Sequence, residues 1–261
     1  MSVLTDIPKE PGYTGPFDGG RQNGQTIEKR VREYEGFIDV HSIFHTIQGE
    51  GPFCGMPAVF VRLAGCNLCC PFCDTEYTEG RKQMSPTTVL AKVESVSQGS
   101  QTGLVVITGG EPFRQPEGLK ELIDTLVFAG YFIQVESNGS LAPPKSVLWT
   151  KDTSLRQGAY LVCSPKSGIV HPEVWRAACC AKYVGTANDL CDDGLPRQAL
   201  GHPVKDKLAR PPVSFSNPIY LQPVDHQDEI QNKANLDAVV ESCMKHGYTI
   251  QVQIHKLLGM E

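Results

Sequence analysis

Four cysteines lie within the eight-residue segment 66–73, and their spacing points to metal chemistry. Cys66, Cys70 and Cys73 follow the pattern C-x3-C-x2-C, directly after a segment with the composition of a strand. A loop this short can bring three thiolates to different irons of one cube of four irons and four sulfurs. Three protein ligands leave the fourth iron open to a small molecule. We therefore predict that these three residues ligate a 4Fe-4S cluster.

Cys69 leaves a second interpretation open. It creates two abutting C-x2-C pairs, Cys66/Cys69 and Cys70/Cys73, and four cysteines can form a tetrahedral zinc site. Structural zinc sites usually draw their pairs from separate parts of the chain, and eight consecutive residues seldom converge on one ion. We expect Cys69 to be a buried, inert thiol. The scattered cysteines are expected to be structural as well: Cys54, Cys163, Cys179, Cys180, Cys191 and Cys243.

The composition narrows the class of protein. The 261 residues are 40% hydrophobic and 20% charged, which suits one large α/β domain or two small ones. The net charge of -5 argues against binding to nucleic acid through the overall field. No segment has the roughly 18 consecutive apolar residues of a membrane span. The N-terminal segment lacks the basic and apolar regions of a signal peptide, so we expect a reducing, cytoplasmic location.

The elements that must position the cysteines alternate between strands and helices. Strands are expected at 37–47, 57–64, 104–108, 131–136, 159–163, 181–184, 219–221 and 248–254. Helices are expected after Ser85-Pro86, at 116–129 and at about 228–246. Such alternation implies an α/β fold with a mainly parallel sheet, and about six parallel strands suggest a partial barrel.

Two segments lie outside this pattern. Residues 1–36 are rich in Gly and Pro and then in alternating charges, which predicts an N-terminal extension with one short exposed helix. Residues 186–217 are polar and rich in Pro and Gly, which predicts an irregular insertion. We expect the remainder of 37–261 to form a single domain.

A second motif gives the cluster its expected chemistry. Gly109, Gly110 and Glu111 follow Thr108, which ends a predicted buried strand 35 residues after the last cluster cysteine, and continue into Pro112. C-x3-C-x2-C followed by GGEP resembles the radical S-adenosylmethionine superfamily. The resemblance implies a partial (β/α)6-type barrel and a cluster that cleaves S-adenosylmethionine, with the GGE motif binding the methionyl amino group. Glycines allow close backbone approach, and a carboxylate can accept from an ammonium.

Finer motifs resemble one family in this superfamily, 7-carboxy-7-deazaguanine synthase, from about residue 40 to the C-terminus apart from the insertion. The first is the run QGEG at 48–51, followed by a strand that carries Arg62. The resemblance implies that Gln48 and Glu50 hold a pterin, and that Arg62 pairs with the pterin carboxylate. A guanidinium suits that role because it is permanently charged and grips both oxygens. Taken alone, an arginine in a strand can equally reach solvent at a sheet edge.

The second motif follows the cluster cysteines. Asp74, Thr75 and Tyr77 match a family stretch that binds magnesium beside the substrate. Oxygen ligands and retained water fit magnesium, and we assign Thr75 as a ligand, with Asp74 as an indirect ligand or a support. An Asp-Thr pair can also simply cap a turn.

Further motifs fall at the carboxyl ends of predicted strands, where parallel barrels gather their active sites. ESNG at 136–139 resembles the family's ETNG, which assigns Glu136 to the substrate and Ser137 to S-adenosylmethionine. By the same resemblance, Ser164 in SPK and Gln222 in LQP contact S-adenosylmethionine. Any one of these motifs could be an ordinary turn.

The last motif, Gln253-Ile254-His255-Lys256, resembles the family's QTHK, with Ile in place of Thr. The resemblance assigns His255 to the substrate carboxylate, although a late histidine is often just packed at the surface. In relatives the C-terminal carboxylate also reaches the substrate. Glu261 ends this chain at a suitable distance, but its side chain adds a charge.

Together the motifs imply a carbon–nitrogen lyase that converts 6-carboxy-5,6,7,8-tetrahydropterin to 7-carboxy-7-deazaguanine with loss of ammonia, as in queuosine-type 7-deazapurine biosynthesis. The implied cofactors are a 4Fe-4S cluster, S-adenosylmethionine and Mg²⁺. The implied partners are a flavodoxin- or ferredoxin-type electron donor and a second copy in a homodimer, with neither nucleic acid nor membrane.

Two other functions remain compatible with the cysteine loop. A glycyl-radical activase of the same superfamily would accommodate a protein loop and need no pterin-carboxylate site. A non-catalytic binding module with zinc or a cluster would leave GGEP and Gln-x-His-Lys unexplained.

Overall fold

The sheet of the protein is mainly parallel. The computed structural model describes residues 24–73 and 75–260, whose strands form one sheet in the order β3-β1-β2-β4-β5-β6-β7-β8-β9. The strands are β1 (Ile38–Ile47), β2 (Pro57–Leu63), β3 (Lys82–Met84), β4 (Leu104–Gly109), β5 (Phe132–Ser137), β6 (Ala159–Cys163), β7 (Ala178–Gly185), β8 (Ile219–Pro223) and β9 (Thr249–Ile250). Neighbouring strands from β2 to β9 are parallel, whereas β1 is antiparallel to β2 and β3. The predicted α/β class with a mainly parallel sheet is confirmed.

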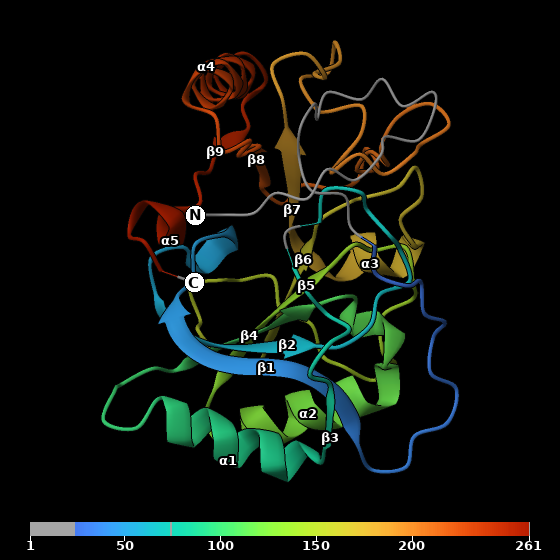
Figure 1. The fold of residues 1–261 in the computed structure, drawn as a ribbon, viewed down its shortest axis with the longest axis vertical. Coiled ribbons are helices and arrows are strands. Elements are labelled where there is room, and N and C mark those ends of the chain that lie inside the picture. The colour runs from blue at the N-terminus through green and yellow to red at the C-terminus, as the bar shows by residue number, and fades with distance from the viewer. Residues whose placement is uncertain (1–23, 74, 261) are drawn as a thin grey trace.

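Helices cover the outside of this sheet. They are α1 (Pro86–Val96), α2 (Pro116–Phe128), α3 (Pro172–Ala177), α4 (Glu229–His246) and α5 (Ile254–Leu257), with 3-10 turns η1 (Gly51–Phe53) and η2 (Pro112–Arg114). The α1 helix begins at Ser85, whose hydroxyl accepts from the Thr88 amide 3.2 Å away. Figure 1 shows α1 and α2 side by side beneath β1 and β2, and α4 beside β8 and β9. None of the helices described is long and apolar enough to cross a membrane.

The two faces of the sheet differ because side chains alternate along each strand. The outward residues Val105, Ile107, Ile133 and Val135 belong to a large apolar core with residues of α1 and α2. The inward residues of these two strands and of β6 form a second apolar cluster, which contains Leu104, Val106, Phe132, Tyr160 and Val162.

Polar side chains replace this inner cluster toward the carboxyl ends of the strands. Gln134 and Glu136 lie two and four residues beyond Phe132, Lys182 lies two beyond Cys180, and Arg62 two beyond Phe60. Period-two alternation therefore places these residues on the same inner face. The interior of the barrel is therefore apolar at one end and polar at the carboxyl ends of the strands, where the motifs lie. We call this polar end, with Gln134, Glu136 and Lys182, the polar cup.

One expected element is wrong, and a second is missing from the part of its range that the structure describes. The strand expected at 248–254 is only the two residues of β9, and α5 follows it. Gln251 still donates its backbone N–H to Leu221 of β8, and its side-chain amide bonds the N–H and C=O of Gly51 at 2.8 and 3.1 Å before α5 begins. The helix expected within 1–36 is also absent from its described part, residues 24–36. Backbone N–H groups of this segment bond distant residues instead of a helical turn, since the Val31 N–H donates to the Arg114 carbonyl.

Residues 186–217 contain no helix or strand. Leu195, Ala199 and Leu208 of this segment are buried in a cluster with Leu221 and Val239, which ties the segment to β8 and α4. The segment also reaches the cysteine loop, because the Leu200 carbonyl accepts from the Phe72 amide at 3.1 Å.

Candidate active site

The loop that carries the cysteines, residues 64–77 and here called the cluster loop, begins where β2 ends. Cys66 and Cys70 are buried and Cys73 is half-buried, and none of these three described cysteines forms a disulfide. Burial, with nearby negative charge for Cys66, raises the pKa of both Cys66 and Cys70 to about 12. These thiols are therefore protonated at neutral pH, and binding a metal cluster must release their protons.

Gly109 and Gly110 let the end of β4 lie directly against the cluster loop. A Cβ atom on Gly109 would lie 2.2 Å from the Leu63 carbonyl oxygen, and one on Gly110 would lie 2.1 Å from the Gly65 carbonyl oxygen. Gly109 also has a φ of 119°, which favours glycine. The two glycines thus hold the GGE turn beside the residue that precedes Cys66.

Glu111 joins the GGE turn to the end of β5. Its carboxylate is fully buried and accepts from the Phe113 amide at 2.9 Å, the Ser137 hydroxyl at 2.7 Å and the Asn138 amide at 2.8 Å. Burial raises the pKa of Glu111, although the three donors oppose that shift. Both carboxylate oxygens of Glu111 accept hydrogen bonds from within the protein. Glu111 therefore links the carboxyl ends of β4 and β5, which are neighbours in the sheet.

A buried ion-pair cluster fills the polar cup. The Lys182 ammonium contacts Glu50 and lies 3.1 Å from the Glu136 carboxylate. Burial disfavours the charge of Glu50, but the Lys182 ammonium and the amides of Gln253 and Gln222 outweigh it and lower the pKa of Glu50 to about 2. One cation thus keeps Glu50 ionised and orients both carboxylates.

Glutamine side chains surround the two carboxylates. Gln222 and Gln253 donate to Glu50 at 3.1 and 2.7 Å, and Gln48 and Gln134 donate to Glu136 at 3.2 and 2.8 Å. The side-chain oxygens of Gln134 and Gln222 are buried without a hydrogen-bond partner among the residues described. Unpaired buried acceptors are costly, so they suit a ligand that brings N–H donors into the cup.

The comparison with known proteins decides the family. Residues 61–148 match the family model "Radical SAM superfamily". The chain is 36% identical over 226 residues to 7-carboxy-7-deazaguanine synthase of Rhodospirillum rubrum, which covers 84% of this chain and 91% of the relative. This chain belongs to the 7-carboxy-7-deazaguanine synthase family.

Further members support this assignment. The family protein of Rickettsia prowazekii is 34% identical over 233 residues, covering 86% of this chain and 89% of its own. The crystal structure of QueE from Escherichia coli aligns with a TM-score of 0.58 at 23% identity, covering 83% of this chain and 94% of that one. That likeness confirms the radical S-adenosylmethionine partial-barrel fold. Membership implies a 4Fe-4S cluster and S-adenosylmethionine.

Family membership, rather than the arrangement of the cysteines, favours a 4Fe-4S cluster over a zinc ion. Among residues 24–73 and 75–260, no three His, Cys, Asp or Glu side chains gather as ligands of one ion. The assignment of Cys66, Cys70 and Cys73 as the cluster ligands stays a prediction. Cys69, expected to be buried, is half-buried.

The structure brings together part of the site that the resemblance implies. Gln48, Glu50, Glu136 and Gln222 lie in one hydrogen-bond network, so Gln222 contacts the carboxylate assigned to substrate. Ser164 is buried, and the Lys166 ammonium donates to its hydroxyl at 2.6 Å.

Other expected residues lie around this network. The Arg62 guanidinium lies 4.7 Å from the centre of the Phe44 ring. The His255 imidazole occupies the space that a side chain on Gly49 would need. Thr75 is half-buried on the cluster loop. Asp74 and Glu261 lie outside the described residues.

Lys182, Gln134 and Gln253 belong to the network but were not expected there. Lys182 is the second residue of a short strand, 181–184, that is otherwise apolar, and Gln134 interrupts the strand 131–136 in the same way. A buried strand interior seldom carries charge unless the charge is paired. The polar residues in these apolar strands indicated that Lys182 and Gln134 have buried partners. The sequence did not identify the partners of Lys182, because they are 132 and 46 residues away in the chain.

Gly110→Ala tests the contact between the GGE turn and the cluster loop. The new methyl group would collide with the Gly65 backbone, which cannot rotate away as a side chain can. We expect the variant to fold but to hold its cluster poorly, with iron content reduced to less than about half, since overpacking costs roughly 1–3 kcal/mol. Iron and sulfide analysis after reconstitution measures this. A variant with full cluster content would contradict the role assigned to the glycine.

Proposed function

We propose that this chain converts 6-carboxy-5,6,7,8-tetrahydropterin to 7-carboxy-7-deazaguanine with loss of ammonia. The observation that carries the proposal is the cup formed by Glu50, Lys182 and Glu136 with the two unpaired glutamine oxygens. One edge of a pterin presents an amino group and a ring N–H, which are donors. Ionised carboxylates and amide oxygens are the acceptors that such an edge requires.

The carboxylate of the substrate requires a cation instead. Arg62 is on the same inner face as the cup, and His255 lies against Gly49 beside Glu50. A guanidinium can donate two parallel hydrogen bonds to a carboxylate. We assign the carboxylate end of the substrate to these two residues and the amino edge to Glu50 and Glu136.

The reaction begins with cofactors that the chain must hold at the same end of the barrel. Cys66, Cys70 and Cys73 would hold the 4Fe-4S cluster, which would supply the one-electron reduction of S-adenosylmethionine needed for hydrogen abstraction at pterin carbon 6. Gly109 and Gly110 hold the turn beside Cys66, and Ser137 and Ser164 offer hydroxyls nearby. The buried cup excludes water from the substrate and fixes its orientation.

Three further assignments belong to this proposal. Thr75, with Asp74, would hold Mg²⁺ through oxygen atoms. A flavodoxin- or ferredoxin-type protein would supply the electron, and two copies would form a homodimer. The chain would divide into an N-terminal extension, 1–36, and one catalytic domain, 37–261, with its insertion at 186–217.

Product formation tests the proposal directly. The anaerobically reconstituted and reduced protein is incubated with S-adenosylmethionine, Mg²⁺ and carboxytetrahydropterin, and 7-carboxy-7-deazaguanine is identified by absorbance and mass. We expect product and an electron paramagnetic resonance signal of the cluster that changes with S-adenosylmethionine. A responsive cluster without product would contradict the substrate, and a cluster that ignores S-adenosylmethionine would favour a non-catalytic module.

Arg62→Ala tests the carboxylate end of the site. Hydrogen bonds to charged groups contribute roughly 1.5–3 kcal/mol, so we expect the substrate Kd to rise roughly 10- to 100-fold. Equilibrium binding to the unreduced protein measures this without turnover, and Arg62→Lys keeps the charge without the paired donors. Iron content is expected to stay unchanged. An unaltered Kd would exclude Arg62 as the carboxylate partner.

A further inference from the structure

Residues 24–34, here called the strap, cross the cluster loop near both of its ends. The Gln25 side chain bonds two backbone groups there, because its Nε2 donates to the Thr75 carbonyl at 2.9 Å and its Oε1 accepts from the Tyr77 amide at 2.6 Å. At the other end of the loop, Ile27 forms a parallel bridge with Cys66, and the Glu28 amide donates to the Cys66 carbonyl at 2.7 Å. One short segment therefore spans the loop from its first cysteine to the residues after its last.

The strap is itself attached to a rigid part of the protein through Arg114. The Arg114 carbonyl accepts from the Val31 amide at 2.7 Å, and its guanidinium pairs with Glu28 at 3.2 Å. The same guanidinium donates to the Ala64 carbonyl at 2.9 Å and lies against Gly65, where a Cβ atom would approach it to 2.5 Å. Arg114 thus connects the strap to the start of the cluster loop.

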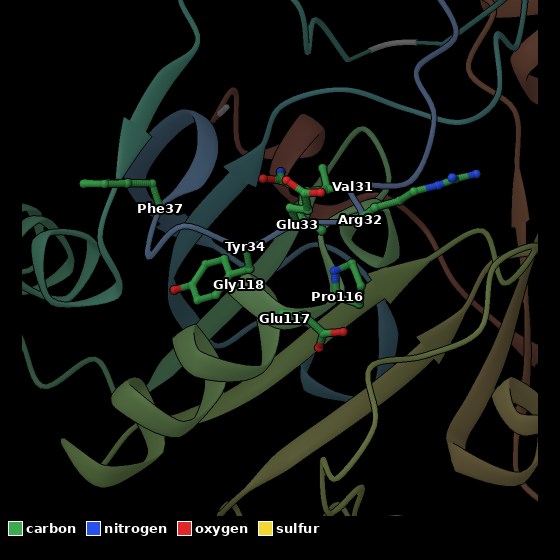
Figure 2. Close-up of a pocket in the computed structure, with 9 residues that line it drawn as sticks. Val31, Arg32, Glu33, Tyr34, Phe37, Pro116, Glu117 and Gly118 are labelled. Atoms are coloured by element: carbon green, nitrogen blue, oxygen red, sulfur yellow. The ribbon is translucent and has the colours of Figure 1, made fainter.

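The far end of the strap packs on α2. Figure 2 shows Tyr34 beside Gly118 at the start of that helix. The Tyr34 hydroxyl donates to Glu121 at 2.7 Å. The pocket between the two segments has a volume of only about 10 Å³, roughly the least that admits a water molecule.

We propose that the strap closes the cluster loop and that Gln25 is a positioning residue for it. The cluster loop is irregular, so the positions of its three thiols depend on contacts from outside the loop. By bonding the Thr75 carbonyl and the Tyr77 amide, Gln25 would hold the backbone after Cys73 in place and so slow the loss of iron from a bound cluster. The inference rests on the proposed function because it assumes the 4Fe-4S cluster.

Gln25→Ala in the reconstituted, full-length protein tests this role. The visible absorbance of the oxidised cluster is followed anaerobically after a ferrous-iron chelator is added. We expect the variant to lose its cluster about tenfold faster, which corresponds to about 1.4 kcal/mol for two lost hydrogen bonds. Gln25→Glu, which keeps the acceptor for Tyr77 but not the donor for Thr75, is expected to fall in between.

Tyr34→Phe is the matched control. It also removes one hydrogen bond of the strap, but at α2 rather than at the cluster loop, and should change the rate less than twofold. Melting of the metal-free variants separates positioning from general stability. The inference is overturned if Gln25→Ala loses its cluster as slowly as the parent protein, or if Tyr34→Phe accelerates the loss equally. A cluster that does not respond to S-adenosylmethionine would instead count against the proposed function and leave these rates interpretable.

Discussion

Lys182→Met is expected to reduce product formation at least about 100-fold. The substitution keeps the length of the side chain but leaves Glu50 and Glu136 buried without the cation between them. Removing one partner of a buried ion pair costs about 3–5 kcal/mol, because the remaining charge is uncompensated. The carboxylates would then bind protons or draw in water, and neither state presents fixed acceptors to a pterin. Steady-state rates of product formation and the substrate Kd measure the effect.

The pH dependence of Lys182→Met distinguishes loss of charge from loss of packing. In the parent protein Lys182 lowers the pKa of Glu50, so this carboxylate is ionised throughout the neutral range. Without Lys182, burial would raise the pKa of Glu50, so its ionised fraction and the residual activity should increase as the pH rises. Lys182→Arg keeps the charge and should retain more activity than Lys182→Met. Residual activity that does not change with pH, at the level of the parent protein, would show that the cup does not bind substrate.

Cys70→Ser is expected to abolish the cluster and all product formation, whereas its neighbour Cys69→Ser keeps both within about twofold. A 4Fe-4S cube in this family has three protein ligands, so the loss of one cannot be compensated by the protein. Both cysteines lie on the cluster loop, and they differ in burial, since Cys70 is buried and Cys69 half-buried. The pair is thus matched in position and chemistry.

Iron and sulfide content, visible absorbance and cleavage of S-adenosylmethionine measure the two variants. Cys69→Ser should cleave S-adenosylmethionine at the rate of the parent protein. A four-cysteine zinc site predicts a different result, in which both variants lose their metal equally. Equal loss of iron in the two variants would therefore contradict the assignment of Cys66, Cys70 and Cys73 as the ligand set.

Much of the fold could be predicted because its signals are local. The strands at 104–108, 131–136 and 159–163 and the helices after Ser85 and at 116–129 all appear in the structure near their expected bounds. Apolar periodicity and helix caps depend only on nearby residues. The strand expected at 248–254 was wrong beyond Ile250, where contacts distant in the chain take over. Its residues suit a strand, but the Gln251 side chain bonds Gly51, which lies 200 residues earlier in the chain.

The cluster loop was the part of the site most accessible to sequence reasoning. Cys66, Cys70 and Cys73 lie within eight residues, so their spacing alone limits what they can bind. The GGE motif is equally local, although its glycines gained a role only from the structure. They accommodate the backbone of Leu63 and Gly65, a contact between segments about 45 residues apart.

The cluster cysteines, the superfamily and the order of strands and helices could be predicted from the amino-acid sequence, because each depends on residues close together in the chain. The tertiary structure alone decided that Lys182 lies between Glu50 and Glu136, and that Gln25 spans the end of the cluster loop. A parallel barrel places the carboxyl ends of distant strands side by side. Which charges meet there depends on the register and curvature of the whole sheet, which no single segment encodes.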